Sequence, residues 1–170
     1  MIARPIPENS ILELVQGFST KPRGAKLVVL GDYDGDNDPY HRAVLDAASP
    51  EVTFLGAIYD PDTVQALRYH SLGYLHGHTV GGTNPSLVEA LAAGNPVIAH
   101  DNKYNTWVAG GAGLYFTTPA DAEKRIDQLL EDSELAGRLG RAARQRYESE
   151  FTWDHVAGQY EALLRKAKGQ

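Results

Sequence analysis

Short apolar runs alternate with amphipathic stretches over the first two thirds of the chain. The apolar runs, which we expect to form β-strands, are Ala25–Leu30, Val52–Leu55, Leu72–Leu75, Pro96–Ala99 and Leu114–Phe116. Runs of this length, separated by segments of helical periodicity, indicate parallel strands buried on both faces. The pattern therefore predicts an α/β fold: a Rossmann-like parallel sheet with helices on both faces and a ligand at the carboxyl ends of the strands.

The helical segments show a single apolar stripe and clear start signals. Ile11 to Phe18 carries apolar residues at helical spacing, and Asp60-Pro61 opens a further helix. After Pro119 the pattern is helical only, over 120–130, 133–147 and 153–166. Ile2 and Ala3 resemble the end of a strand, so we expect the chain to begin within an element. We expect one domain over residues 1–170.

The stretch from His76 to His100 contains, in order, a predicted strand end, a glycine-rich turn, a helix and a second strand. Asn84 is a good N-cap and Pro85 fits the first helical position, so a helix should start there with its first amides free. Free amides and the helix dipole favour an anion, and the glycines let it approach the backbone. Glu89 falls outside the apolar stripe and faces either ligand or solvent. The alternative is a glycine turn without a ligand and a solvated glutamate.

An acidic stretch, Gly31 to Asp38, follows the first long apolar run. It is not an EF-hand loop, because Asn37 and Ala43 stand where glycine and glutamate are needed. Asp32 and Asp34 resemble the Asp-x-Asp-Gly signature of haloacid-dehalogenase-type phosphatases, but no late acidic pair accompanies them. A solvated loop is favoured, with Asn37 or Asp38 capping a helix over 39–48.

Composition narrows the classes of function. The formal charge of −6 argues against general nucleic-acid binding, and no apolar run approaches the length of a membrane span. The chain contains no cysteine, which excludes disulfides and thiolate metal sites and suits a reducing cytosol. We expect a soluble cytoplasmic protein. No cluster of metal ligands is visible, so we expect no metal and no cofactor.

Several of these motifs together resemble a known family. The motifs are Gly31-Asp32 after the first long strand, the glycine turn His76-Gly77-His78 to Asn84, Glu89-Ala90, Gly94-Asn95-Pro96 and Phe151-Thr152-Trp153. Their order resembles the C-terminal, nucleotide-sugar-binding domain of retaining two-domain glycosyltransferases with the GT-B fold, of the group 1 type. The glycine turn is similar to that of a rhamnosyltransferase-like branch.

The resemblance implies a donor-binding site whose catalytic residues it does not name. It assigns Glu89 to the ribose hydroxyls and Arg4 to the diphosphate; Gly81, Gly82, Thr83 and Asn84 would offer amides, and His78 could donate to phosphate or sugar. Two positions depart from the family pattern. Gly81 stands where a glutamate for the transferred sugar is expected, and Asn9 stands at or near the position of a phosphate-binding lysine.

The resemblance also implies partners and a setting. A sugar would pass from a nucleoside diphosphate sugar to a saccharide or lipid-linked saccharide acceptor, in cell-surface polysaccharide or lipopolysaccharide synthesis. The acceptor would bind a separate N-terminal domain, toward which the terminal helix over 151–170 would pack. We expect this piece to bind without transferring, and the full enzyme to work in the cytoplasm, with peripheral association at the inner face of the plasma membrane. The alternatives are a nucleotide-sugar 2-epimerase and a non-catalytic nucleotide-binding module.

Overall fold

The computed structural model describes residues 1–169 and confirms the α/β class. The strands are β1 (Leu27–Val29), β2 (Val52–Phe54), β3 (Tyr74–His76), β4 (Val97–His100) and β5 (Gly113–Phe116). The α-helices are α1 (Ile11–Ser19), α2 (Pro39–Asp46), α3 (Pro61–Tyr69), α4 (Pro85–Ala92), α5 (Lys103–Ala109), α6 (Pro119–Glu131), α7 (Ser133–Glu150) and α8 (Trp153–Ala167), and short 3₁₀ turns cover Pro7–Asn9 and Gly110–Ala112. Strand β1 pairs with β2, and β4 pairs with β3 and β5, all in parallel.

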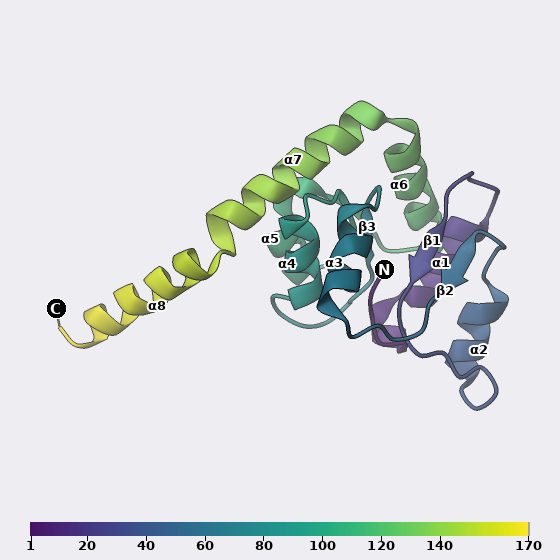
Figure 1. The fold of residues 1–170 in the computed structure, drawn as a ribbon, viewed down its shortest axis with the longest axis horizontal. Coiled ribbons are helices and arrows are strands. Elements are labelled where there is room, and N and C mark those ends of the chain that lie inside the picture. The colour runs from purple at the N-terminus through teal and green to yellow at the C-terminus, as the bar shows by residue number, and fades with distance from the viewer. Residues whose placement is uncertain (170) are drawn as a thin grey trace.

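Helices cover both faces of the sheet that contains β4 (Figure 1). The side chains of β4 alternate between the two cores that these helices form. Ile98 faces the larger core, which contains α1 and α6 residues such as Phe18 and Ile126. Val97 and Ala99 face the second core, which is formed mainly by α4, α5 and α7. This alternation of successive side chains is the geometric property of a strand.

The helix starts confirm the capping predictions. The Asp38 carboxylate accepts hydrogen bonds from the amides of Tyr40 and His41 at the start of α2, and Asp60 accepts from the amide of Thr63 in α3. Each helix has proline at its first position, where the missing amide hydrogen costs nothing. The acidic stretch before α2 is therefore a capping loop.

The expected single sheet is divided into two. Met1 to Ala3 forms a parallel bridge with Leu30 at the edge of β1 opposite β2. A groove of about 650 Å³ lies between this region and β3, and Lys26, Tyr74 and Ile126 are among the residues that line it. The amino-terminal nitrogen of Met1 is buried and donates a hydrogen bond to the carbonyl of Val28 at 2.9 Å. Burial, followed by the charge of Arg68, lowers the pKa of this amine to about 5.

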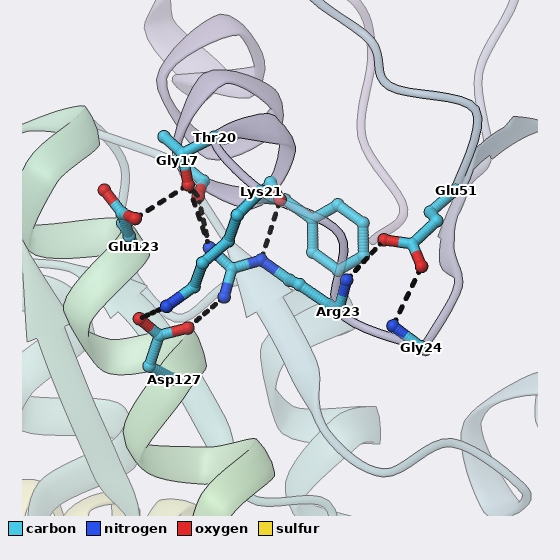
Figure 2. A network of polar contacts seen from close by, with 9 residues as sticks. Gly17, Thr20, Lys21, Arg23, Gly24, Glu51, Glu123 and Asp127 are labelled. Atoms are coloured by element: carbon cyan, nitrogen blue, oxygen red, sulfur yellow. Dashed lines mark hydrogen bonds and ion pairs between the residues drawn. The ribbon is translucent and has the colours of Figure 1, made fainter.

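A polar network fastens the end of α1 to α6 (Figure 2). The side chain of Arg23 is 2% exposed; it pairs with Asp127 of α6 and donates to the carbonyls of Gly17 and Phe18 at 2.8 and 2.7 Å. Lys21 reaches the same carboxylate at 2.8 Å from a more exposed position. Gly17 permits the close approach of the helices, since a Cβ there would lie 2.6 Å from the carbonyl oxygen of Pro119.

The last helix, α8, extends away from the body of the fold beyond α7 (Figure 1). Tyr160 and Leu163 on α8 are exposed, while Val156 is partly buried. Within residues 1–169, no helix is both long enough and apolar enough to cross a lipid bilayer. Packing of α8 against another domain stays a prediction.

Candidate functional site

Two loops meet at the carboxyl end of β3. The amide and the hydroxyl of Thr79 both donate to the carbonyl of Glu8, at 2.8 and 3.0 Å. Gly77 lies so close to this first loop that a Cβ would overlap the carbonyl oxygen of Asn9. Glycine at position 77 therefore allows the segment that carries Arg4 to lie against the segment that carries His78.

Asn9 does not replace the phosphate-binding lysine that the resemblance leads one to expect at or near its position. Its side chain is 4% exposed and donates from Nδ2 to the carbonyl of Arg4 at 2.8 Å. Asn9 thus fixes the backbone of the Arg4 loop. Arg4 itself is exposed, and its charge is close enough to lower the pKa of His78.

The two histidines of the His-Gly-His motif have different environments. His76 is 1% exposed and, within residues 1–169, neither of its ring nitrogens has a hydrogen-bond partner. Burial, followed by the nearby charge of His78, lowers the pKa of His76 to about 3. His76 is therefore a packed, neutral histidine, without the backbone hydrogen bond that such residues usually make. His78 is only partly buried, and burial followed by the charge of Arg4 lowers its pKa.

Two asparagines that sequence reasoning did not assign to the site hold the His78 segment in place. Asn102 caps α5, and its Nδ2 donates to the carbonyl of His78 at 2.9 Å. Asn105 is 3% exposed and bridges the carbonyls of His78 and His100 at 2.8 and 2.9 Å. The N-cap pattern of Asn102 before a helix was the signal in the sequence that could have indicated its role.

The glycine turn supplies free amides, but α4 does not. Asn84 caps α4 as predicted, yet its side-chain oxygen accepts from the amide of Ser86 at 3.0 Å, and its carbonyl accepts from Leu87 at 3.1 Å. The expectation that the first amides of the helix are free is therefore wrong, because the cap satisfies them. The amides of 81–84 have no partner within the described chain, so the unpaired donors lie one turn earlier than expected.

Gly81 has a φ of +127°, a backbone conformation that side chains rarely adopt. No heavy atom lies within 4 Å of a Cβ built on Gly81. The glutamate that the resemblance expects here would meet no steric obstacle, but its backbone would be strained. The backbone conformation of the turn at position 81 therefore favours glycine.

Glu89 has a partner that the sequence did not reveal. Its Oε2 lies 2.5 Å from a terminal nitrogen of Arg68, in the last turn of α3. The Arg68 side chain is 5% exposed and that of Glu89 is 45% exposed. Glu89 thus faces both a buried cation and solvent. Arg68 gave no signal in the sequence, because an arginine near the end of a helix is ordinarily read as a solvated residue.

A glycosyl transferase-like family model matches residues 11–162, nearly the whole chain. The chain belongs to this family. The capsular polysaccharide biosynthesis glycosyltransferase CapM of Staphylococcus aureus is 26% identical over 99% of this chain and 47% of CapM. This glycosyl transferase-like chain therefore spans about half the length of that relative.

Solved structures confirm that the fold is that of GT-B carboxyl-terminal domains. The sucrose-phosphate synthase of Thermosynechococcus elongatus superposes with a TM-score of 0.82 at 21% identity, covering 99% of this chain and 45% of that one. HepE from Anabaena in complex with UDP gives a TM-score of 0.83 at 18% identity, covering 97% and 47% of the two chains. The rhamnosyltransferase-like branch stays a prediction.

Proposed function

We propose that this domain binds a nucleoside diphosphate sugar at the carboxyl end of β3 and serves a retaining glycosyltransferase of cell-surface polysaccharide synthesis. The observation that carries the proposal is the run of amides at 81–84, which have no partner within residues 1–169 and of which 81–83 belong to exposed residues. This run lies next to the loops that bring Arg4 and His78 to one edge. Family membership and the relative CapM, a capsular polysaccharide glycosyltransferase, support it. HepE, a structure of the same fold, is in complex with UDP.

Each side chain has a role in the proposed chemistry. The turn amides and Arg4 would hold the diphosphate, whose negative charge grows as it leaves with the electron pair of the broken bond to the anomeric carbon. The oxygen of an acceptor hydroxyl would form the new bond to that carbon and give its proton to an oxygen of the departing diphosphate. Glu89 would accept hydrogen bonds from ribose hydroxyls.

The acceptor and the metal requirement belong to the same proposal. An acceptor saccharide, lipid-linked or free, would bind residues outside this chain, which spans about half the length of the relative CapM. We propose that amides and arginine suffice to neutralise the diphosphate, so that binding needs no metal. The chain alone would then bind the donor without transferring the sugar.

The test is calorimetric titration of the chain with UDP, GDP and dTDP, each with and without EDTA. We expect micromolar-range binding of one nucleotide, unchanged by EDTA and weakened about 10-fold or more in Arg4→Met, since a charged hydrogen bond contributes roughly 1.5–3 kcal/mol. Arg141→Met, which removes an exposed arginine on α7, is the control and should bind like the wild type. Absence of binding for all three nucleotides would refute the proposal.

A further inference from the structure

The ion pair between Arg68 and Glu89 joins a buried cation to a half-exposed carboxylate. A buried guanidinium requires a compensating charge, because burial removes the water that would otherwise solvate it. Glu89 supplies that charge through Oε2 at 2.5 Å. The pairing therefore restrains the rotamer of Glu89.

The backbone of Arg68 is itself held against the end of α4. The carbonyl of Arg68 accepts hydrogen bonds from Asn95 Nδ2 at 2.9 Å and from Ser71 Oγ at 2.8 Å. Asn95 is 2% exposed, and its amide donates to the carbonyl of Ala90 at 3.0 Å. The guanidinium of Arg68 thus extends from a backbone that is fixed relative to the helix that carries Glu89.

One of the two carboxylate oxygens of Glu89 is available to a ligand. Arg68 contacts Oε2, whereas Oε1 forms no hydrogen bond or ion pair to any residue in 1–169. A carboxylate oxygen accepts up to two hydrogen bonds, so a ligand hydroxyl can bind Glu89 without displacing Arg68. Glu89 also lies on the helix that directly follows the glycine turn.

We propose that Arg68 is a positioning residue of the donor site: it orients Glu89 so that the free oxygen of the carboxylate accepts a hydrogen bond from a ribose hydroxyl of the nucleotide. This inference rests on the proposed function and adds to it a residue that touches no ligand. Arg68 acts by selecting one rotamer of Glu89, so its effect is confined to ligands that carry the hydroxyl.

The experiment compares each of UDP, GDP and dTDP with its counterpart lacking the ribose 3′-hydroxyl, by titration of the whole chain. For the nucleotide that binds, the wild type should prefer the 3′-hydroxyl form about 10-fold, as expected for one hydrogen bond to a charged group. In Arg68→Met the preference should fall to about 2-fold or less, while affinity for the 3′-deoxy form stays within about 2-fold of the wild type. Arg68→Lys should recover part of the preference.

Two further variants separate positioning from a general structural effect. Glu89→Gln keeps the shape of the side chain and should lose the same preference as Arg68→Met, with no further loss in the double variant. Arg144→Met removes an exposed arginine that donates to the carbonyl of Ala92 at the end of the same helix, at 2.6 Å, and should keep the wild-type preference. If Arg68 had only a structural role, Arg68→Met would weaken the binding of both ligand forms equally.

The outcomes distinguish the two proposals. A wild type that binds no nucleotide refutes the proposed function and this inference together. A wild type that binds without regard to the 3′-hydroxyl, or a folded Arg68→Met that keeps the full preference, overturns the inference and leaves the proposed function standing. If Arg68→Met does not fold, Arg68→Lys and Glu89→Gln decide: wild-type preference in both overturns the inference.

Discussion

The imidazole of His76 lies flat against that of His78, with ring centroids 4.4 Å apart and planes 10° apart. On its other side His76 stacks on Tyr74, with centroids 6.1 Å apart. The stack runs from the interior of β3 to the carboxyl edge of the sheet, where the proposed ligand binds. The buried ring of His76 therefore supports the position of the partly exposed ring of His78.

Acidification should destabilise the protein through His76. The pKa of its ring is about 3 in the folded chain and about 6.5 when unfolded, so between these values only the unfolded chain binds the proton. The contribution of neutral His76 to the free energy of unfolding is fully present above about pH 6.5 and declines as the pH falls toward 3. From pH 6.5 to 4 the loss would approach about 3 kcal/mol, at 1.36 kcal/mol per unit.

Chemical denaturation at a series of pH values measures this loss. His76→Phe keeps a stacked ring and removes the titration, so its free energy of unfolding should fall less steeply than that of the wild type over this range. His70→Phe replaces an exposed histidine at the end of α3 and is the control, expected to follow the wild-type curve. Equal slopes for His76→Phe and wild type would contradict the prediction.

Gly77→Ala should destabilise the protein by about 1–3 kcal/mol, the usual cost of forcing atoms into a packed site. The new methyl group would overlap the carbonyl oxygen of Asn9 and push apart the loops that carry Arg4 and His78. Gly82→Ala is the matched control, because no atom lies within 4 Å of a Cβ at that position. Urea unfolding that gives the same free energy for both variants would refute the close approach.

Asn84→Asp should separate stability from ligand binding. Aspartate caps helices as well as asparagine does and interacts favourably with the helix dipole, so stability should be kept or slightly raised. The added negative charge lies beside the amides proposed to hold the diphosphate, so affinity should fall about 10-fold, or about 1.4 kcal/mol.

Thermal unfolding and titration of the same preparation measure both properties of the Asn84 variants. Asn84→Ala should instead lose about 1 kcal/mol of stability, because the cap is removed. Unchanged nucleotide affinity in Asn84→Asp would place the diphosphate elsewhere.

Asp127→Asn should cost about 3 kcal/mol of stability. The charge of Arg23, whose side chain is 2% exposed, would lose its ionic partner, and breaking a buried pair leaves an uncompensated charge. Lys21→Met, which removes the more exposed partner of the same carboxylate, should cost no more than about 1 kcal/mol. Equal effects of the two substitutions in urea unfolding would show that burial of Arg23 does not set the strength of the pair.

The sequence predicted the features that depend on local chemistry. Caps at Asp38, Asp60 and Asn84 and the strand positions follow from residue types that act within three or four positions of themselves. The amphipathic stretch from Ile11 likewise became α1. The resemblance carried by several motifs, the glycine turn among them, then added the GT-B assignment to the α/β fold that the apolar pattern predicts.

The sequence did not predict contacts between residues far apart in the chain. Arg68 and Glu89 lie on different helices, and Asn105 reaches a carbonyl 27 positions earlier. Such pairs depend on how helices pack, which single-chain periodicity does not specify. The position of the free amides was predicted wrongly for a related reason. Asn84 was recognised as a cap, but its side chain and its carbonyl accept hydrogen bonds from the first amides of α4, which are therefore not free.

The bridge between Ile2 and Leu30 has a practical consequence for handling this chain. Met1 lines the groove between the two sheets, and the segment that it begins runs parallel to β1, so a tag joined directly to residue 1 would start at the groove and compete with its packing. A tag joined after α8, whose residues are largely in solvent, would not meet this groove.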